Sequence, residues 1–203
     1  FLLNTHLNPL INDGEKAIEE IRHLMKIFES RYDAAILWRP HPLSIETIKS
    51  MNPGILKDYQ MVISEFERLE NGIYDDSNSP HLALAVADGY IGNWSSLVTM
   101  FGITGKPVYI RNIALQESKR NKMDLMSEKG VQQLENAAKD QRLQTVYLEK
   151  NVEPEMFIDA IVAGIDPLKK YRKNEFQEIV FEADEKAGEL IWKNVWQDLW
   201  QDE

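Results

Sequence analysis

Short apolar runs alternate with segments of helical periodicity along the first 110 residues of the chain. The unbroken run AAILW, residues 34–38, is typical of a strand that is buried on both faces of a sheet. The other runs are equally short and are bounded by polar residues. We therefore predict five strands, at residues 1–4, 34–38, 72–76, 89–91 and 107–110.

The segments between these strands repeat apolar residues every three or four positions, which predicts amphipathic helices. The first helix falls within residues 12–32 and places Ile18 and Phe28 on one side. Within residues 44–70, the break at Asn52-Pro53-Gly54 divides the pattern into two helices. Two shorter helices are predicted at residues 81–87 and 95–101.

Strand and helix alternate in the order expected of a parallel sheet with helices on both faces. The predicted fold class is therefore α/β, with a Rossmann-like sheet. Beyond residue 110 the pattern weakens, and it predicts a surface loop or irregular helix, then a sixth strand and a helix, at residues 116–130, 145–148 and 154–163. We expect one nucleotide- or phosphate-binding domain over residues 1–165, followed by a linker and a C-terminal helix over residues 166–203.

Trp192, Trp196 and Trp200 recur every four residues in the last predicted helix, residues 183–200, and form an apolar stripe. One interpretation is a helix that lies on a membrane surface. Acidic residues outnumber basic ones in this helix, so anionic lipid would repel it. We therefore favour packing against this or a neighbouring domain, including a dimer contact through the three tryptophans.

The composition is that of a soluble globular domain, with 43% hydrophobic and 28% charged residues in a chain of 203. No run of about 18 apolar residues predicts a membrane span. The net charge of −10 argues against a nucleic-acid-binding surface, which needs a basic face. Because the chain has no cysteine and no histidine cluster, we predict no disulfide, no metal site and no required cofactor.

The chain starts with phenylalanine, and its first segment, FLLNT, is typical of a buried strand and not of a free terminus. We therefore expect it to be part of a longer protein. The first residues also lack the basic region and apolar core of a signal peptide, which favours a cytoplasmic location.

Ligands bind open parallel sheets beyond the carboxyl ends of the strands, so the residues at those ends are the candidates for a site. They are polar and mixed in charge, and cationic groups are available. They are Thr5 and His6 after the first strand, Arg39 and His41 after the second, Asp75 and Asp76 after the third, Asn93, Ser95 and Ser96 after the fourth, and Arg111 after the fifth.

Ser95 and Ser96 stand where the fourth strand gives way to a helix. The first N–H groups of a helix have no partner within it and carry partial positive charge. A phosphate group can accept them, with the serine hydroxyls as further donors, and Gly92 allows the backbone to approach closely. The alternative is that Ser95 is an ordinary helix N-cap.

Arg39 and His41 lie in a loop that Pro40 and Pro42 stiffen, because proline fixes the φ angle. The prolines also predict that this loop, residues 39–44, has no regular structure. Arginine can bind a phosphate in a bidentate manner, and His41 could donate to a phosphate oxygen. The alternative is an arginine paired with a carboxylate and a histidine that caps the next helix.

The remaining candidates carry weaker predictions. Asp75 and Asp76 could bind Mg²⁺ or act as a base, but a solvated turn before the next helix is the simpler interpretation. Thr5, His6 and Arg111 are additional polar groups at the same edge and complete the set of possible phosphate ligands.

The segments ILWRPHPL, GIYDD, ADGYIGNWSSL and GKPVYI follow one another across roughly residues 34–112. In this order and spacing they resemble the C-terminal half of the CDP-glycerol glycerophosphotransferase family, the polymerases and primases of teichoic-acid synthesis. In that family an arginine–proline–histidine–proline loop follows one strand. A serine pair follows a later strand, and a lysine–proline pair begins the next.

The resemblance implies the C-terminal half of a glycosyltransferase-B fold, which holds the nucleotide donor. His41, assisted by Arg39, would contact the donor phosphates, and Ser95 and Ser96, with Asn93 beside them, would hold the pyrophosphate. An acceptor hydroxyl would attack the β-phosphate of CDP-glycerol and displace CMP. The family's acid/base histidine lies in the N-terminal half, so we expect no catalytic residue in this chain and no activity from it alone.

Two features depart from the family. Asn93-Trp94 replaces an aspartate–tyrosine pair, and Met100 stands where an acidic residue would accept the ribose hydroxyls. We therefore predict the donor-binding half of a transferase that uses CDP-glycerol, or another nucleotide diphosphate conjugate, in cell-surface polymer synthesis. The alternative is a non-catalytic, transferase-like binding or assembly module of a larger bacterial protein. A nucleotide-sugar epimerase half is a weaker third interpretation.

The resemblance also implies the partners. They are the missing N-terminal half of the same protein and a nucleotide-linked small molecule. In the full-length protein, a role in surface-polymer synthesis would add a peripheral position at the inner face of the cell membrane to the cytoplasmic location.

Overall fold

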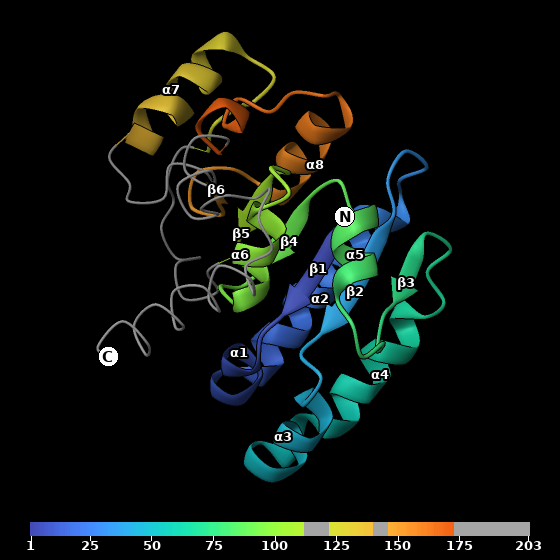
Figure 1. The fold of residues 1–203 in the computed structure, drawn as a ribbon. Helices are drawn as coiled ribbons and strands as arrows, with labels where there is room; N and C mark the ends of the chain where they lie inside the picture. Colours follow the sequence, from blue (N-terminus) through green and yellow to red (C-terminus); the bar gives the residue numbers. More distant parts are fainter. Residues whose placement is uncertain (112–121, 140–145, 173–203) are drawn as a thin grey trace, which may run out of the picture.

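A computed structural model describes residues 1–111, 122–139 and 146–172 of the chain (Figure 1). It shows an α/β fold with one six-stranded sheet in which every strand pair is parallel. The strand order is β3-β2-β1-β4-β5-β6, so the chain starts in the middle of the sheet and builds first one half and then the other. The predicted Rossmann-like α/β fold is confirmed.

The strands begin and end within two residues of their predicted positions. β2 includes Arg39 and Pro40, for which a loop was predicted, and that part of the prediction was wrong. Pro40 fits because the next ladder bond is made by the backbone N–H of His41, which donates to the carbonyl oxygen of Thr5 at 3.2 Å. The strands are β1 Leu2–Thr5, β2 Ile36–Pro40, β3 Gly72–Tyr74, β4 Tyr90–Gly92, β5 Val108–Ile110 and β6 Val146–Leu148.

Helices connect the strands, and two of them were not predicted. The first is α1, a short helix that contains Pro9 and precedes the helix predicted within residues 12–32. The second is α7, whose apolar residues are few, and Leu134 is the one buried apolar side chain among residues 128–136. The helices are α1 Leu7–Asn12, α2 Gly14–Glu29, α3 Ser44–Met51, α4 Leu56–Phe66, α5 His81–Val86, α6 Ser96–Gly102, α7 Glu128–Lys139 and α8 Pro154–Val162, with a 3-10 turn η1 Pro53–Ile55.

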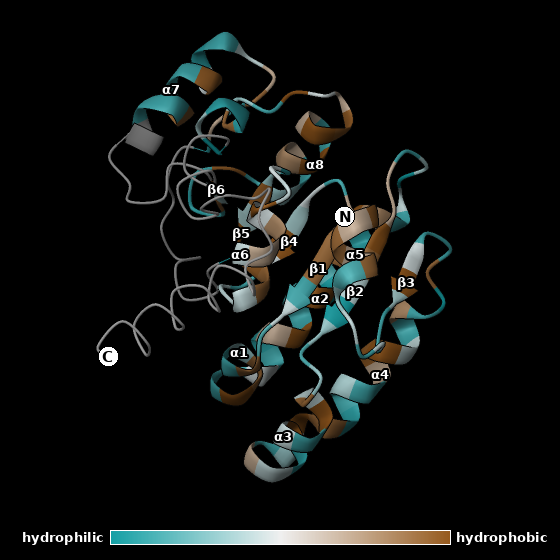
Figure 2. Cartoon of the chain, in the orientation of Figure 1, coloured by the Kyte–Doolittle hydropathy of each residue, from teal (hydrophilic) through white to brown (hydrophobic). Residues whose placement is uncertain are grey.

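Two separate hydrophobic clusters bury the two faces of the sheet. Trp38 and Phe157 belong to the larger cluster, which α2, α3, α4 and α8 cover. Tyr90 and Phe101 belong to the smaller one, which α5 and α6 cover. Successive strand residues point to opposite faces, so both clusters draw on the same strands. Figure 2 shows that β1 and β2 are apolar along most of their length and polar at their carboxyl ends.

The strand order determines where the polar residues at the strand ends come together. β1 and β4 are neighbours in the sheet, but the chain leaves β1 for α1 and α2 on one face and leaves β4 for α6 on the other. Connections that diverge in this way open a crevice at the carboxyl ends of the two strands. The predicted site residues after β1 and β4 therefore meet at this position.

Within the described residues, the packed unit extends past residue 165. Leu168 and Arg172 are fully buried, and the hydroxyl of Tyr147 donates to Asp166 at 2.7 Å. Among the helices that the structure describes, none is long and apolar enough to cross a membrane. The predicted C-terminal helix at residues 183–200, with Trp192, Trp196 and Trp200, lies outside the described residues.

Gly92, the last residue of β4, cannot carry a side chain without moving β1. A Cβ atom there would lie 2.3 Å from the backbone carbonyl oxygen of Asn4. We expect Gly92→Ala to lower the free energy of unfolding by about 1–3 kcal/mol, measured by urea denaturation. Gly54→Ala is the matched control, because a Cβ at Gly54 meets no atom within 4 Å. Equal urea midpoints for the two variants would contradict the expectation.

Candidate functional site

A buried polar network centred on Asn4 joins the carboxyl ends of three strands. The side-chain amide of Asn4 donates to the carbonyl oxygen of Arg39 in β2 at 2.9 Å. Its Oδ1 accepts from the hydroxyl of Tyr90 in β4 at 3.0 Å and from that of Ser95 at 3.1 Å. Burial raises the pKa of Tyr90, so its hydroxyl keeps its proton and remains a donor.

Ser95 occupies the N-cap position of α6, but its side chain does not cap the helix. The residue is extended, with φ −158° and ψ 170°, and its hydroxyl makes no hydrogen bond to the first turn of the helix. The hydroxyl instead belongs to the Asn4 network. Ser96 is exposed, and its hydroxyl has no hydrogen bond among the described residues. Of the serine pair, Ser96 is therefore the one that can offer a hydroxyl to a ligand.

Arg39 is held in a largely buried ion pair with Asp75, across the carboxyl ends of β2 and β3. The guanidinium Nη1 lies 2.6 Å from Oδ2 of Asp75 and 3.1 Å from Oγ of Ser77. The side chains of Arg39 and Asp75 are 6% and 15% exposed. The geometry fits the interpretation of an arginine paired with a carboxylate. Asp76, in contrast, is exposed and has no ion-pair partner among the described residues.

The environment of Asp75 lowers its pKa. Burial by itself raises the pKa of this carboxyl group, but hydrogen bonds from Ser77 and Arg39 outweigh that effect and hold the pKa below its ordinary value. The carboxylate is therefore ionised at neutral pH, and the ion pair with Arg39 is intact there.

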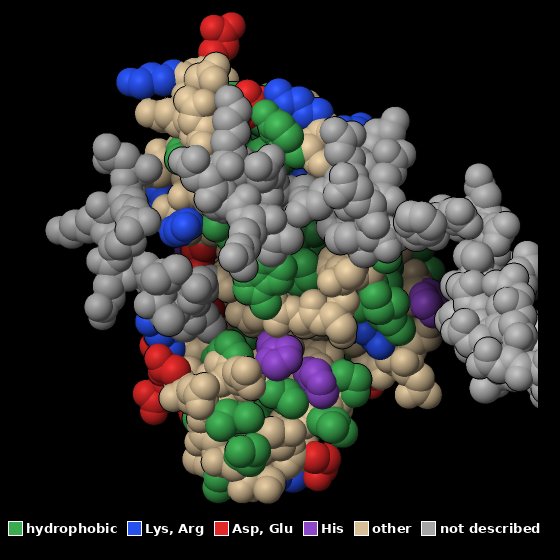
Figure 3. Space-filling model, turned by 60° about the vertical axis from the view of Figure 1, so that its left-hand side comes forward, with side chains coloured by type: hydrophobic (Ala, Val, Ile, Leu, Met, Phe, Trp, Pro, Cys, Tyr) green, Lys and Arg blue, Asp and Glu red, His purple; other side chains and the backbone are tan. Residues whose placement is uncertain are grey.

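His6 and His41 follow neighbouring strands, and their rings meet edge to face with 6.0 Å between centroids. Figure 3 shows two histidine side chains side by side on the surface of the molecule. Nδ1 of His6 accepts from the backbone N–H of Asn8 at 3.3 Å, at the start of α1. Nδ1 of His41 accepts from the backbone N–H of Leu43 at 3.2 Å, just before α3. His6 is the N-cap of α1, whereas the ring of His41 binds the N–H of Leu43, which precedes α3, and makes no hydrogen bond to the first turn of that helix.

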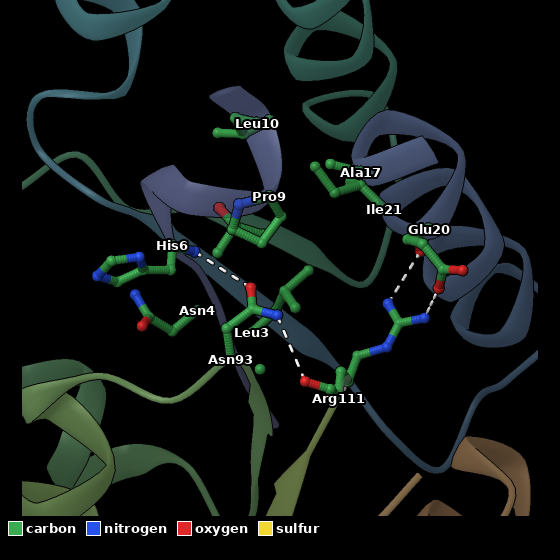
Figure 4. A pocket seen from close by; sticks show the side chains of 12 residues that line it. Leu3, Asn4, His6, Pro9, Leu10, Ala17, Glu20, Ile21, Asn93 and Arg111 are labelled. Atoms are coloured by element: carbon green, nitrogen blue, oxygen red, sulfur yellow. Dashed lines mark hydrogen bonds and ion pairs between the residues drawn. The ribbon is translucent and has the colours of Figure 1, made fainter. Parts of the chain in front are cut away.

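Asn93 links three strand ends across the crevice. Its Oδ1 accepts from the backbone N–H of His6 at 3.2 Å, and its Nδ2 lies 3.5 Å from the carbonyl oxygen of Arg111 (Figure 4). The site residues after β1, β4 and β5 are thus brought together through one amide side chain.

Arg111 is buried between two carboxylates, Glu20 of α2 and Glu149 after β6. Its Nε lies 3.3 Å from Glu149, its Nη1 donates to the carbonyl oxygen of Glu20 at 3.2 Å, and its guanidinium also pairs with the Glu20 carboxylate (Figure 4). Burial lowers the pKa of Arg111, whereas the carboxylate of Glu149 opposes that effect.

The roles of Glu20 and Glu149 were not predicted from the sequence. For Glu20 a signal exists, because it lies at helical spacing from Ala17 and Leu24 on the buried side of α2. A carboxylate on an apolar stripe indicates a buried partner. For Glu149 the signal is weaker, namely an acidic residue directly after a predicted strand.

These residues surround a pocket at the carboxyl ends of β1 and β4 (Figure 4). Its cavity volume is about 20 Å³, which is enough for about one water molecule. A larger ligand would therefore lie across the mouth of the pocket and not inside it. The polar groups that line it come from Asn4, Thr5, His6, Glu20, Asn93 and Arg111.

The predicted site residues differ in how they lie relative to the pocket. Thr5, His6, Asn93 and Arg111 line the pocket, whereas His41, Ser95 and Ser96 lie next to these residues in space or in sequence. Arg39 and Asp75 form a separate ion pair, and Asp76 is exposed. Across the described parts of the chain, no group of three or more histidine, aspartate and glutamate side chains could hold a metal ion.

Comparisons with known proteins give no match: no family model, no curated protein and no solved structure is significantly similar to this chain. The resemblance seen in the sequence segments therefore stays a prediction.

Asp75→Asn should destabilise the protein in a pH-dependent way. Because the folded-state pKa of Asp75 is lowered, the pair stabilises the fold above the unfolded pKa of about 3.9, and this contribution is lost as the pH falls through the folded-state pKa. At pH 7 we expect a loss of about 3 kcal/mol in the free energy of unfolding, because the substitution leaves Arg39 buried without its partner charge.

The measurement is urea unfolding of both proteins between neutral and acidic pH, with the difference shrinking below about pH 4. Asp76→Asn is the matched control and should change the stability little, because Asp76 is exposed. A constant difference at every pH would contradict the assignment.

Asn4→Ala should be among the most destabilising changes at this edge. It removes three hydrogen bonds, to the carbonyl oxygen of Arg39 and to the hydroxyls of Tyr90 and Ser95, each at a cost of about 0.5–1.5 kcal/mol. In a double-mutant cycle with Tyr90→Phe, we expect the two losses to be strongly non-additive. Additive losses, or a loss no larger than that of the exposed control Asn78→Ala, would be inconsistent with a central role for Asn4.

Proposed function

We propose that this chain is the donor-binding half of a transferase that uses a nucleotide-activated polyol phosphate such as CDP-glycerol. The observation that carries the proposal is the position of the pocket. It lies where the strand order reverses, between β1 and β4 of an all-parallel sheet, which is where such sheets bind nucleotides and other phosphorylated ligands.

The groups at the mouth of the pocket suit a phosphate chain. The hydroxyl of Ser96 and the imidazoles of His6 and His41 are hydrogen-bond donors that reach the surface. Asn93 holds the loop after β4 against the start of α1, which keeps these donors in one place. In the proposed reaction, the acceptor hydroxyl attacks the β-phosphate of the donor, a new P–O bond forms, and CMP leaves.

The rest of the machinery would come from the N-terminal half of the protein. This chain would bind and orient the donor, and an acid/base group of the other half would remove the proton of the acceptor hydroxyl. In surface-polymer synthesis the full-length protein would work at the inner face of the cell membrane.

A second candidate is a non-catalytic binding or assembly module of the same architecture. The observation that favours it is that both arginines predicted as phosphate ligands are already in ion pairs. Arg39 is engaged by Asp75, and Arg111 is engaged by Glu20 and Glu149, so neither guanidinium is available to neutralise a pyrophosphate. Met100, 36% exposed, also offers no acceptor for ribose hydroxyls.

Calorimetry on the full-length protein with CDP and CDP-glycerol tests the first candidate against the second. We expect binding, with His41→Ala and Ser96→Ala each weakening it about tenfold, the effect of about one lost hydrogen bond to a charged group. Ser50→Ala, an exposed serine on α3, is the control and should leave the affinity unchanged. If neither compound binds, the transferase proposal is wrong and the module remains.

A further inference from the structure

The strongest further observation concerns the paired histidines. Thr5 and Pro40 are register partners in the β1–β2 ladder, and His6 and His41 are the residues that follow them. The two rings therefore leave adjacent strands at the same level, with 6.0 Å between their centroids and an angle of 73° between their planes. Each N–H···O bond spans about 2.9 Å, so the spacing of the rings is short enough for one small oxyanion to lie within reach of both.

The hydrogen bonds of the rings determine which nitrogen carries the proton. In both rings Nδ1 accepts a backbone N–H, from Asn8 in one case and from Leu43 in the other. A neutral imidazole has one protonated nitrogen, so the proton lies on Nε2 in both. Nε2–H is a hydrogen-bond donor and has no lone pair for a metal ion, which makes the pair suited to an anion.

The charged groups around the pair leave it without a counter-ion of its own. Arg39 and Asp75 pair with each other on the β2–β3 side, Arg111 pairs with Glu20 and Glu149 behind the pocket, and Glu46 pairs with Lys49 on α3. His23 lies 3.8 Å from Glu155, whereas neither His6 nor His41 has an ion pair with a carboxylate in the part of the chain that the structure describes.

We propose that His6 and His41 act as one oxyanion-binding pair that receives a single terminal phosphoryl group through both Nε2 atoms, and that this binding strengthens as the pair takes up a proton. The proposal rests on the proposed function for the identity of the ligand, since the group would be a phosphoryl of the nucleotide donor. It predicts that His6, which the sequence analysis gave only as a possible additional ligand, is as important for binding as His41.

The sign of the pH dependence follows from the surroundings of the rings. Without a ligand, burial and the neighbouring His6 lower the pKa of His41, so this ring is neutral at physiological pH. An anion between the rings favours the protonated form. Protonation of a ring adds a hydrogen at Nδ1 and breaks one weak bond to the backbone, but an opposite charge at hydrogen-bond distance outweighs that loss. Anion affinity should therefore rise as the pH falls.

Ring-nitrogen NMR of the full-length protein at about pH 8 tests the tautomers without any ligand. We expect an unprotonated Nδ1 and a protonated Nε2 in both His6 and His41. A protonated Nδ1 in either neutral ring would overturn the inference, because its Nε2 would then be an acceptor.

Sulfate is the probe for binding, because it remains a dianion at all pH values of interest. We expect its affinity to rise between about pH 8 and about pH 6, and His6→Asn and His41→Asn each to reduce it about tenfold and to flatten the pH dependence. The oxygen of asparagine can replace Nδ1 as the acceptor of the backbone N–H, so this bond is kept and Nε2 is removed. His23→Asn is the control and should bind sulfate as the unchanged protein does.

A sulfate affinity that is the same at both pH values, or that is unchanged in both variants, would overturn the proposal. Inorganic phosphate and CDP-glycerol, tested on the same variants, separate it from the proposed function. If sulfate and phosphate bind through both histidines but CDP-glycerol does not bind, the pair is supported and the transferase proposal fails. If CDP-glycerol binds and His6→Asn has no effect on it, the pair is refuted and the transferase proposal stands.

Discussion

The side chain of Asn4 is the constraint on which the carboxyl edge of the sheet depends. One buried amide group satisfies the carbonyl oxygen of Arg39 and the hydroxyls of Tyr90 and Ser95, so it holds β1, β2 and the start of α6 in one arrangement. Without it each of these groups would lose a hydrogen bond, which is costly in a medium of low dielectric constant. Gly92 completes the constraint, because only a residue without a Cβ atom lets β4 approach Asn4 this closely.

The two buried arginines at this edge hold neighbouring elements of the fold together. Arg39 ties β2 to the loop after β3, and Arg111 ties β5 to α2 and to the residues after β6. Buried ion pairs of this kind contribute little net stability, but they favour one arrangement of the loops because either partner alone is costly. The mouth of the pocket is therefore left with hydroxyl and imidazole donors.

Much of the fold could be predicted from the sequence, and the errors have physical causes. Apolar runs such as residues 34–38 predicted each strand to within two residues, because a strand in the middle of a parallel sheet is apolar along most of its length. α7 was missed because its apolar residues are few, and Leu134 is the one apolar side chain that it buries among residues 128–136. The site residues at the strand ends were predicted as a set, because parallel strands bring their carboxyl ends to one edge.

The sequence by itself determined the α/β class, the strands and the polar character of the edge, because these depend on hydrophobic periodicity and on local turn chemistry. Only the tertiary structure decided which polar groups are available to a ligand. Ser95 donates a hydrogen bond to Asn4, Arg39 pairs with Asp75, and Arg111 pairs with Glu20. Each partner lies more than 30 residues away in the chain. Hydrogen bonds and ion pairs between such distant residues depend on strand order and register, which local patterns do not contain.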